Sequence, residues 1–205
     1  MSKNYQVIFW DFDGVILESN AIRDLGFERV LADFPVYQVA QLLDFHRKNG
    51  GLSRYVKFRH FFETIRGEEL TDELLAHYTG KFSEIMLQLL KDPSLLIEET
   101  VDFIQRNYQN YTMHIVSGSD QTELRELCSS LGLAAYFKSI HGSPTPKKQW
   151  VGDLLDQYGY DRSQCILIGD AHNDFDAAQH NGIDFMACNA PDLDQYNTGF
   201  IPING

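Results

Sequence analysis

Two carboxylates stand two residues apart where an apolar run meets a glycine. Asp11 and Asp13 follow the run at residues 7–10 and precede Gly14. The run predicts a buried strand, and ligands bind at the carboxyl ends of parallel strands. Acids at positions i and i+2 of a strand point to the same side, which is costly at a buried site unless a cation neutralises them or one keeps a proton. The pattern favours a functional site, with a polar turn at a strand end as the alternative.

Two further segments offer groups that bind anions. An apolar run ends at Val116, and Ser117 and Gly118 follow it with a hydroxyl and backbone N–H groups that can donate to a phosphate. Helix capping is the alternative for this segment. Lys147 follows a loop with two prolines and precedes a predicted helix, where a lysine opposes the macrodipole unless an anion lies nearby. The adjacent Lys148 leaves open which lysine binds, and a solvated pair is the alternative.

A second pair of acids follows another apolar run. Gly169 and Asp170 come directly after the run at 165–168, and Asp174 follows four residues later. Carboxylate oxygens are hard ligands that suit magnesium, so this pair is a candidate for metal binding. His172 lies between the two acids without a His or Cys at ligand spacing, and a structural or solvent-facing role is favoured for it.

The elements that must position these residues follow from hydrophobic patterning. Five apolar runs are continuous rather than alternating, which indicates strands buried on both faces, as in a parallel sheet with helices on either side. Helical periodicity separates the later runs, and Asp120 with Glu123 forms a candidate capping box for one helix. The alternation of strand and helix predicts an α/β fold. The runs span residues 7–10, 113–116, 138–141, 165–168 and 185–188.

The stretch 18–90 interrupts this alternation. Strand-like runs do not occur in it, but apolar residues recur at helical spacing, and Gly50-Gly51 breaks the pattern in the middle. We therefore predict a helical insertion, residues 18–90, in a core domain formed by 1–17 and 91–205.

Two basic residues, Arg54 and Lys57, follow the glycine break. A loop above an active site is a place from which side chains reach the remote part of a substrate. Both are candidate substrate contacts, and ordinary surface charge is the alternative.

Charge and composition exclude several classes of function. The chain of 205 residues has 29 acidic and 17 basic residues, a formal charge of -12, which repels nucleic acids and anionic membrane surfaces. A signal peptide or membrane span would need a longer apolar stretch than the sequence contains, and a cytoplasmic location is predicted. Cys128, Cys165 and Cys188 lack metal-ligand spacing and are predicted to be reduced and buried.

Taken in order, residues 11–15, Ser117-Gly118, Lys147 and 169–174 resemble the four motifs of the haloacid dehalogenase superfamily, in its phosphatase branch. The resemblance covers almost the whole chain, and four motifs in order are far more specific than one. It implies a Rossmann-like core with helices on both faces of a parallel sheet. It also implies that the insertion 18–90 is a type-1 helical cap domain, similar to that of phosphoglycolate phosphatase and β-phosphoglucomutase relatives.

The resemblance assigns a role to each motif. Asp11 is the nucleophile that forms an aspartyl-phosphate, and Asp13 protonates the leaving oxygen and then activates water. Phosphoryl oxygens are bound by Ser117, Gly118 and Lys147. The implied cofactor is Mg²⁺, held by Asp11, the backbone carbonyl of Asp13, Asp170 and Asp174, the last directly or through water.

The activity implied is hydrolysis of a small phosphorylated metabolite, such as a sugar phosphate, phosphoglycolate or a nucleotide-like phosphomonoester. A phosphomutase of the same family uses the same motifs and stays open. A non-catalytic phosphate-sensing or interaction domain is a further alternative, against which the intact motifs argue. The sequence is equally compatible with a monomer and a homodimer.

Overall fold

The computed structural model describes residues 4–203 and contains a sheet of five parallel strands. The strand order is β3-β2-β1-β4-β5, so the first strand lies at the centre, between β2 and β4. This is a Rossmann-like order: successive strands are added on one side of β1 up to β3, and the chain then crosses to the other side of β1 to add β4 and β5. The strands are β1 Val7–Trp10, β2 Thr112–Asp120, β3 Ser139–Ser143, β4 Cys165–Gly169 and β5 Asp184–Ala187.

All five strands predicted from the apolar runs are present, and the α/β prediction is confirmed. Strand β2 continues past the predicted end at Val116 to Asp120, and its register with β3 shifts between these two residues. Strand β5 begins one residue earlier than predicted, at Asp184. Apolar patterning does not detect the end of β2, because residues 117–120 are polar or glycine.

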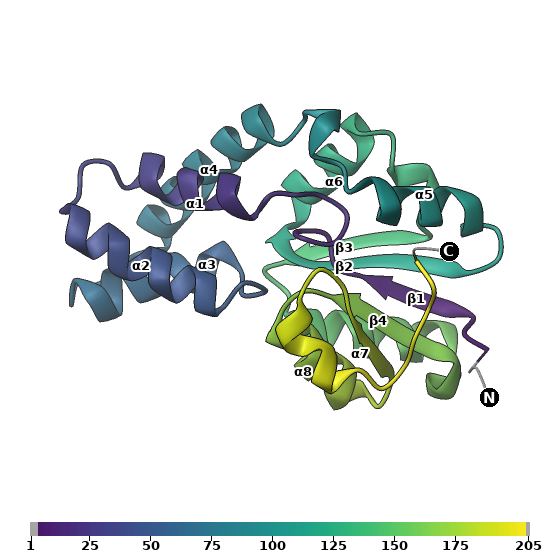
Figure 1. The fold of residues 1–205 in the computed structure, drawn as a ribbon. Helices are drawn as coiled ribbons and strands as arrows, with labels where there is room; N and C mark the ends of the chain where they lie inside the picture. The colour runs from purple at the N-terminus through teal and green to yellow at the C-terminus, as the bar shows by residue number, and fades with distance from the viewer. Residues whose placement is uncertain (1–3, 204–205) are drawn as a thin grey trace.

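Helices cover both faces of the sheet (Figure 1). Alternate residues of β1 point to opposite faces: Ile8 and Trp10 join the core with α5 and α6, whereas Val7 and Phe9 join the core with α7 and α8. The helices are α5 Glu98–Asn107, α6 Gln121–Ser130, α7 Lys147–Tyr158 and α8 His172–Asn181.

The insertion is helical and lies to one side of the sheet (Figure 1). Helix α2 ends just before the predicted break at Gly50-Gly51, and α3 continues directly into a π-helix, His60–Ile65. The α-helices are α1 Asn20–Val30, α2 Val36–Lys48, α3 Arg54–Arg59 and α4 Asp72–Leu89.

The chain enters and leaves this helical part through two segments that lie side by side. Leu17 and Leu96 form an antiparallel bridge. Next to it, the N–H of Glu18 donates to the carbonyl of Leu95 at 2.8 Å, and the N–H of Ile97 donates to the carbonyl of Ile16 at 3.0 Å. These bonds join the two connecting segments to each other, and Leu17 also forms a bridge with Asp13.

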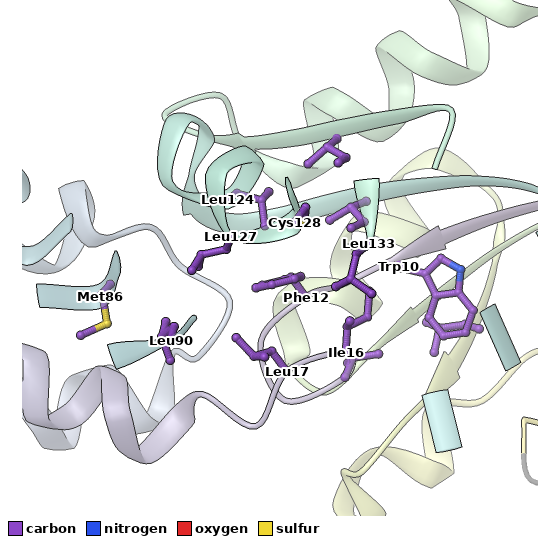
Figure 2. Packing of buried hydrophobic residues seen from close by; sticks show 14 of the residues in the cluster. Trp10, Phe12, Ile16, Leu17, Met86, Leu90, Leu124, Leu127, Cys128 and Leu133 are labelled. Carbon is purple, nitrogen blue, oxygen red and sulfur yellow. The ribbon is translucent and has the colours of Figure 1, made fainter. Parts of the chain in front are cut away.

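A continuous apolar cluster runs from α4 to the sheet (Figure 2). Met86 and Leu90 lie at one end of this cluster and Trp10 at the other, with Phe12 and Leu17 between them; all five are fully buried. Packing of Phe12 and Leu17 in this cluster therefore holds the loop after β1 in place. Asp11 and Asp13 of the same segment are not part of the apolar cluster.

Helix α6 begins with half of the predicted capping box. The carboxylate of Asp120 accepts the N–H groups of Thr122 at 2.9 Å and Glu123 at 3.1 Å. The prediction for Glu123 is wrong, because its side chain is buried and pairs with Arg23 and Arg54 instead of turning back to the cap.

Among residues 4–203, none of the helices combines the length and the apolarity needed to cross a membrane. The three cysteines are free thiols, as predicted. Cys128 and Cys165 are buried, but Cys188 is only partly buried, so the prediction of burial is wrong for Cys188.

The core contact of α6 can be tested with Leu124→Ala. Leu124 is fully buried, and its truncation is expected to lower the free energy of unfolding by about 3 kcal/mol through lost burial and a residual cavity. Urea denaturation measures the change. Leu74→Ala, at a side chain that is 42% exposed, is the control and should cost less than about 1 kcal/mol; equal losses would contradict the packing described here.

Candidate active site

The sheet brings three chain segments to one edge. Asp11 follows β1 directly, and its N–H donates to the carbonyl of Ile168 in β4 at 2.9 Å. On the other side of β1, the end of β2 supplies Ser117 and Ser119. Because parallel strands end at the same edge, residues more than a hundred positions apart meet around Asp11.

A buried lysine joins two of the acids. The Nζ of Lys147 lies 2.8 Å from Oδ1 of Asp11 and also pairs with Asp174. Lys147 is the first residue of α7, the helix that follows β3, and all three side chains are nearly inaccessible. Lys148, the alternative lysine, is exposed.

Three carboxylates form a group of the kind that holds a metal ion. One oxygen each from Asp11, Asp170 and Asp174 lies within 4.8 Å of the others. The donor set consists of hard oxygen atoms, which fits magnesium. The carboxylate of Asp174 also accepts the N–H of Ala171 at 3.0 Å, in the first turn of α8, where the helix dipole favours negative charge.

Asp13 has its own partners. Its Oδ1 accepts from Nε of Arg23 at 2.7 Å and from the hydroxyl of Ser19, and its Oδ2 accepts from the hydroxyl of Ser119 at 2.5 Å. Ser19 and Arg23 come from the start of the helical part, and Ser119 comes from β2. Asp13 therefore lies where the helical part meets the sheet.

Burial and charge shift the pKa values of the acids in opposite directions. Burial and the neighbouring Asp174 raise the pKa of Asp11 well above its usual range, although Lys147 opposes the shift. The same two causes raise the pKa of Asp170 to about 7. Burial also acts on Asp13, but Arg23 and the serine hydroxyls outweigh it and lower the pKa of Asp13. Two acids two residues apart thus favour different protonation states.

The absence of a side chain at Gly14 and Gly169 leaves room for the carboxylates of Asp170 and Asp174. A Cβ at Gly14 would lie 2.0 Å from Oδ2 of Asp170, and the φ of +73° at Gly14 favours glycine as well. A Cβ at Gly169 would lie 2.2 Å from Cγ of Asp174. Larger residues at either position would displace a carboxylate.

The site opens into a cavity of about 760 Å³ between the sheet and the helical part. Its sheet side is lined by Asp11, Asp13, Gly118 and Asp170, among other residues. Ser117, Lys147 and Asp174 are buried behind this lining. His172 is exposed at the cavity, where it contacts the ring of Tyr196.

The helical part supplies the opposite wall. Arg54 and Lys57 both line the cavity and are 4% and 3% exposed, so the alternative of ordinary surface charge is wrong. The Nζ of Lys57 donates to the carbonyl of Gly50 at 3.1 Å. Burial and the nearby Arg23 lower the pKa of Lys57 to about 7.

Sequence reasoning missed Arg23, Glu123 and Ser119. The two carboxylate oxygens of Glu123 pair with Arg23 at 2.9 Å and with Arg54 at 2.6 Å, and Glu123 is buried. Ser119 directly follows Ser117 and Gly118, which were predicted to bind phosphate, but no sequence pattern marks Arg23 or Glu123 as site residues. An arginine in one helix and a glutamate a hundred residues later show no spacing that links them.

Known proteins resemble this chain. A sequence profile described as haloacid dehalogenase-like hydrolase matches residues 7–188. The chain belongs to this family. The resemblance drawn from the four motifs is confirmed, and with it the hydrolase class. Phosphoglycolate phosphatase from Aliivibrio fischeri is 24% identical over 197 residues, which cover 89% of this chain and 83% of that protein, and this likeness supports the phosphatase branch.

A further relative and two solved structures also resemble this chain. A 5'-nucleotidase from Pseudomonas aeruginosa is 28% identical over 80 residues, 37% of this chain and 36% of that protein. CbbY from Rhodobacter sphaeroides in complex with xylulose-(1,5)bisphosphate superposes with a TM-score of 0.72 at 14% identity, covering 92% of this chain and 89% of that chain. The HAD-hydrolase YfnB from Bacillus subtilis bound to magnesium gives 0.69 at 20% identity, covering 97% and 95%.

The group of three carboxylates predicts that a bound cation stabilises the folded protein. Magnesium at about 100 times its Kd should raise the free energy of unfolding by about 2.7 kcal/mol, seen as a higher Tm. Asp170→Asn should abolish this rise and, above pH 7, stabilise the metal-free protein, because it removes a carboxylate whose raised pKa marks an unfavourable charge. Asp176→Asn, at an exposed acid of the same cavity, should keep the magnesium effect. A shift that survives in Asp170→Asn would place the cation elsewhere.

Proposed function

We propose that this chain is a magnesium-dependent phosphatase that hydrolyses a small phosphomonoester through an aspartyl-phosphate on Asp11. The observation that supports it most is the buried pairing of Lys147 with Asp11 inside a group of three carboxylates at the rim of a cavity. Asp11 is the nucleophile because it reaches both the cavity and a cation-binding group. Because the pKa of Asp11 is raised, its ionised form needs positive charge nearby, from Lys147 and from a bound cation.

Asp13 moves the proton. It protonates the leaving oxygen when Asp11 attacks phosphorus, and it accepts a proton from water when the aspartyl-phosphate is hydrolysed. Arg23, Ser19 and Ser119 lower the pKa of Asp13, so this arrangement favours the ionised carboxylate, which is the form that acts as a base. The acid step requires that Asp13 first take up a proton.

Phosphoryl oxygens are held by Ser117, Gly118 and Lys147. The Oγ of Ser117 accepts the N–H of Ser119 at 3.1 Å, so its own hydrogen is available to a phosphoryl oxygen. Backbone N–H groups near Gly118 and the Lys147 ammonium complete the set.

The magnesium ligands are Asp11, the backbone carbonyl of Asp13, Asp170 and Asp174. When bound, the ion offsets charge on the phosphoryl oxygens and on the crowded carboxylates. Residues 18–90 form a cap domain over a core of 1–17 and 91–205, and the cap excludes bulk water from the cavity and presents Arg54 and Lys57 to the substrate. Free thiols and a net negative charge fit a cytoplasmic protein.

The central experiment compares the native protein with Asp11→Asn. Both are assayed with p-nitrophenyl phosphate and a panel of phosphorylated metabolites, with magnesium or with a chelator. Activity should require magnesium and fall by at least about 10⁴-fold in Asp11→Asn, because the nucleophile is lost. Activity that survives in this variant, or inactivity on the whole panel, would reject the proposal; an isomeric product instead of free phosphate would indicate a mutase.

The lysine assignment has a matched pair of variants. Lys147→Gln should reduce kcat by at least about 10²-fold, because a positive charge that stabilises the phosphoryl group in the transition state is removed. Lys148→Gln, one residue away and exposed, should change kcat by less than about twofold. Similar losses in both variants would contradict the assignment.

A further inference from the structure

Helix α7 carries Lys147 in its first turn, where the helix dipole opposes a positive charge. This turn is held to the sheet by Trp150, whose Nε1 donates to the carbonyl of Gly142 in β3 at 2.9 Å. Trp150 stands three positions after Lys147, so the two side chains are neighbours on the helix surface. A movement of this turn away from β3 would therefore withdraw Lys147 from Asp11.

A series of hydrogen-bonding side chains lies along the sheet beside α7. The hydroxyl of Ser139 in β3 lies 2.6 Å from Nδ1 of His114 in β2 and 2.8 Å from Nε2 of His141. The Nε2 of His114 in turn lies 3.0 Å from the hydroxyl of Tyr160. We call His141, Ser139, His114 and Tyr160 the histidine chain.

Both ends of α7 contact the histidine chain. Near the start of the helix, the ring centroid of Trp150 lies 4.2 Å from that of His141. At the end of the helix, the ring centroid of Tyr158 lies 5.7 Å from that of His114. The histidine chain is therefore part of the surface on which α7 packs.

The geometry of the histidine chain suits neutral imidazole rings. The hydroxyl of Ser139 has one hydrogen, so it donates to one ring and accepts from the other when each ring carries one proton. A second proton on His141 would charge a ring whose Nδ1 is buried and lacks a hydrogen-bond partner among residues 4–203. A second proton on His114 would charge a ring that is fully buried and stacked on Phe9. Either charge is costly.

The charged groups that act on the two rings are cations. Among the described residues, Lys138 acts on His114 and Arg125 acts on His141. Burial, His141 and Lys138 lower the pKa of His114 to about 4, and burial and Arg125 lower the pKa of His141. Burial also raises the pKa of the Tyr160 hydroxyl, which therefore stays neutral. The groups that face the rings are Phe9 of β1, Arg125 of α6, Trp150 and Tyr158 of α7, and Lys138 and Tyr160 of the adjoining segments.

We propose that the histidine chain is an acid-sensitive support for α7: it holds Lys147 at Asp11 while both imidazoles are neutral and releases the first turn of the helix when they are protonated. Release lets water reach the rings, and a solvated histidine has a pKa of about 6.5. The closed arrangement therefore loses stability as the pH falls from about 6.5 to about 4. The effect on activity rests on the proposed function of Lys147, whereas the movement of α7 does not.

Hydrogen exchange of the full-length protein tests the release directly. Protection factors of the α7 amides, corrected for intrinsic exchange rates, are compared at pH 7.5 and pH 5.0 with magnesium present. The shift in the pKa of His114 alone predicts an opening constant roughly 30-fold larger at pH 5.0. The amides of α5, on the opposite face of the sheet, should lose less protection. Equal losses in both helices would indicate global unfolding and overturn the proposal, as would an α7 that loses no protection.

Three variants attribute the release to the histidine chain. His114→Gln cannot take up a proton and should remove most of the loss. Lys138→Glu replaces an exposed cation with a carboxylate that favours protonated His114 inside the fold, so the loss should be about threefold smaller. His180→Gln, at an exposed histidine of the neighbouring α8, should leave the loss unchanged. Lys138→Glu and His180→Gln alter exposed residues, so they decide the question even if His114→Gln does not fold. A native-like loss in Lys138→Glu would contradict the proposal.

The pH profile of p-nitrophenyl phosphate hydrolysis links the support to Lys147. With magnesium, kcat of the native protein should fall more steeply between pH 7.5 and pH 5.0 than kcat of Lys138→Glu. Parallel profiles would show that the release does not reach Lys147 and would overturn the proposal. Acid release of α7 in a protein without hydrolytic activity would favour the support and reject the phosphatase, and hydrolysis without acid release would do the reverse.

Discussion

Negative charge buried at one end of a sheet is the constraint on which the site depends. Asp11 and Asp174 are buried beside the partly buried Asp170, and burial and repulsion raise the pKa of Asp11 and Asp170. Lys147 contributes one positive charge to this group, which offsets only part of it. A scaffold gains nothing from such an arrangement, because replacing the acids with apolar residues would remove the cost. The cost is compatible with a site whose ligand supplies the missing positive charge.

The helical part contributes positive charge on the other side of the cavity. Arg23 pairs with Asp13, and Glu123 of α6 pairs with both Arg23 and Arg54. The contact between the two parts is therefore ionic where it borders the site and apolar where Phe12 and Leu17 meet α4. Apolar packing holds the helical part close, and the ion pairs fix which side chains face the cavity.

Much of the fold follows from local sequence because parallel strands are continuous apolar runs. The site was predictable to the extent that its residues stand at the ends of those runs, as Asp11, Ser117 and Asp170 do. Lys147 could not be separated from Lys148 by spacing, since burial decides between them. Glu123 shows the limit most clearly. Its position fits a helix cap, but two distant arginines compete for its carboxylate, and a local pattern contains no trace of them.

The fit of Asp174 against Gly169 has a consequence for the history of such chains. Gly169 needs no left-handed backbone, and the three atoms nearest to a Cβ at this position all belong to the side chain of Asp174. In a descendant that lost Asp174, that space would be empty, and the nearest obstacle to a side chain at position 169 would be gone. The two positions should drift together. A glycine retained ahead of a missing aspartate would mark a recent loss, and a bulky residue in its place would mark an old one.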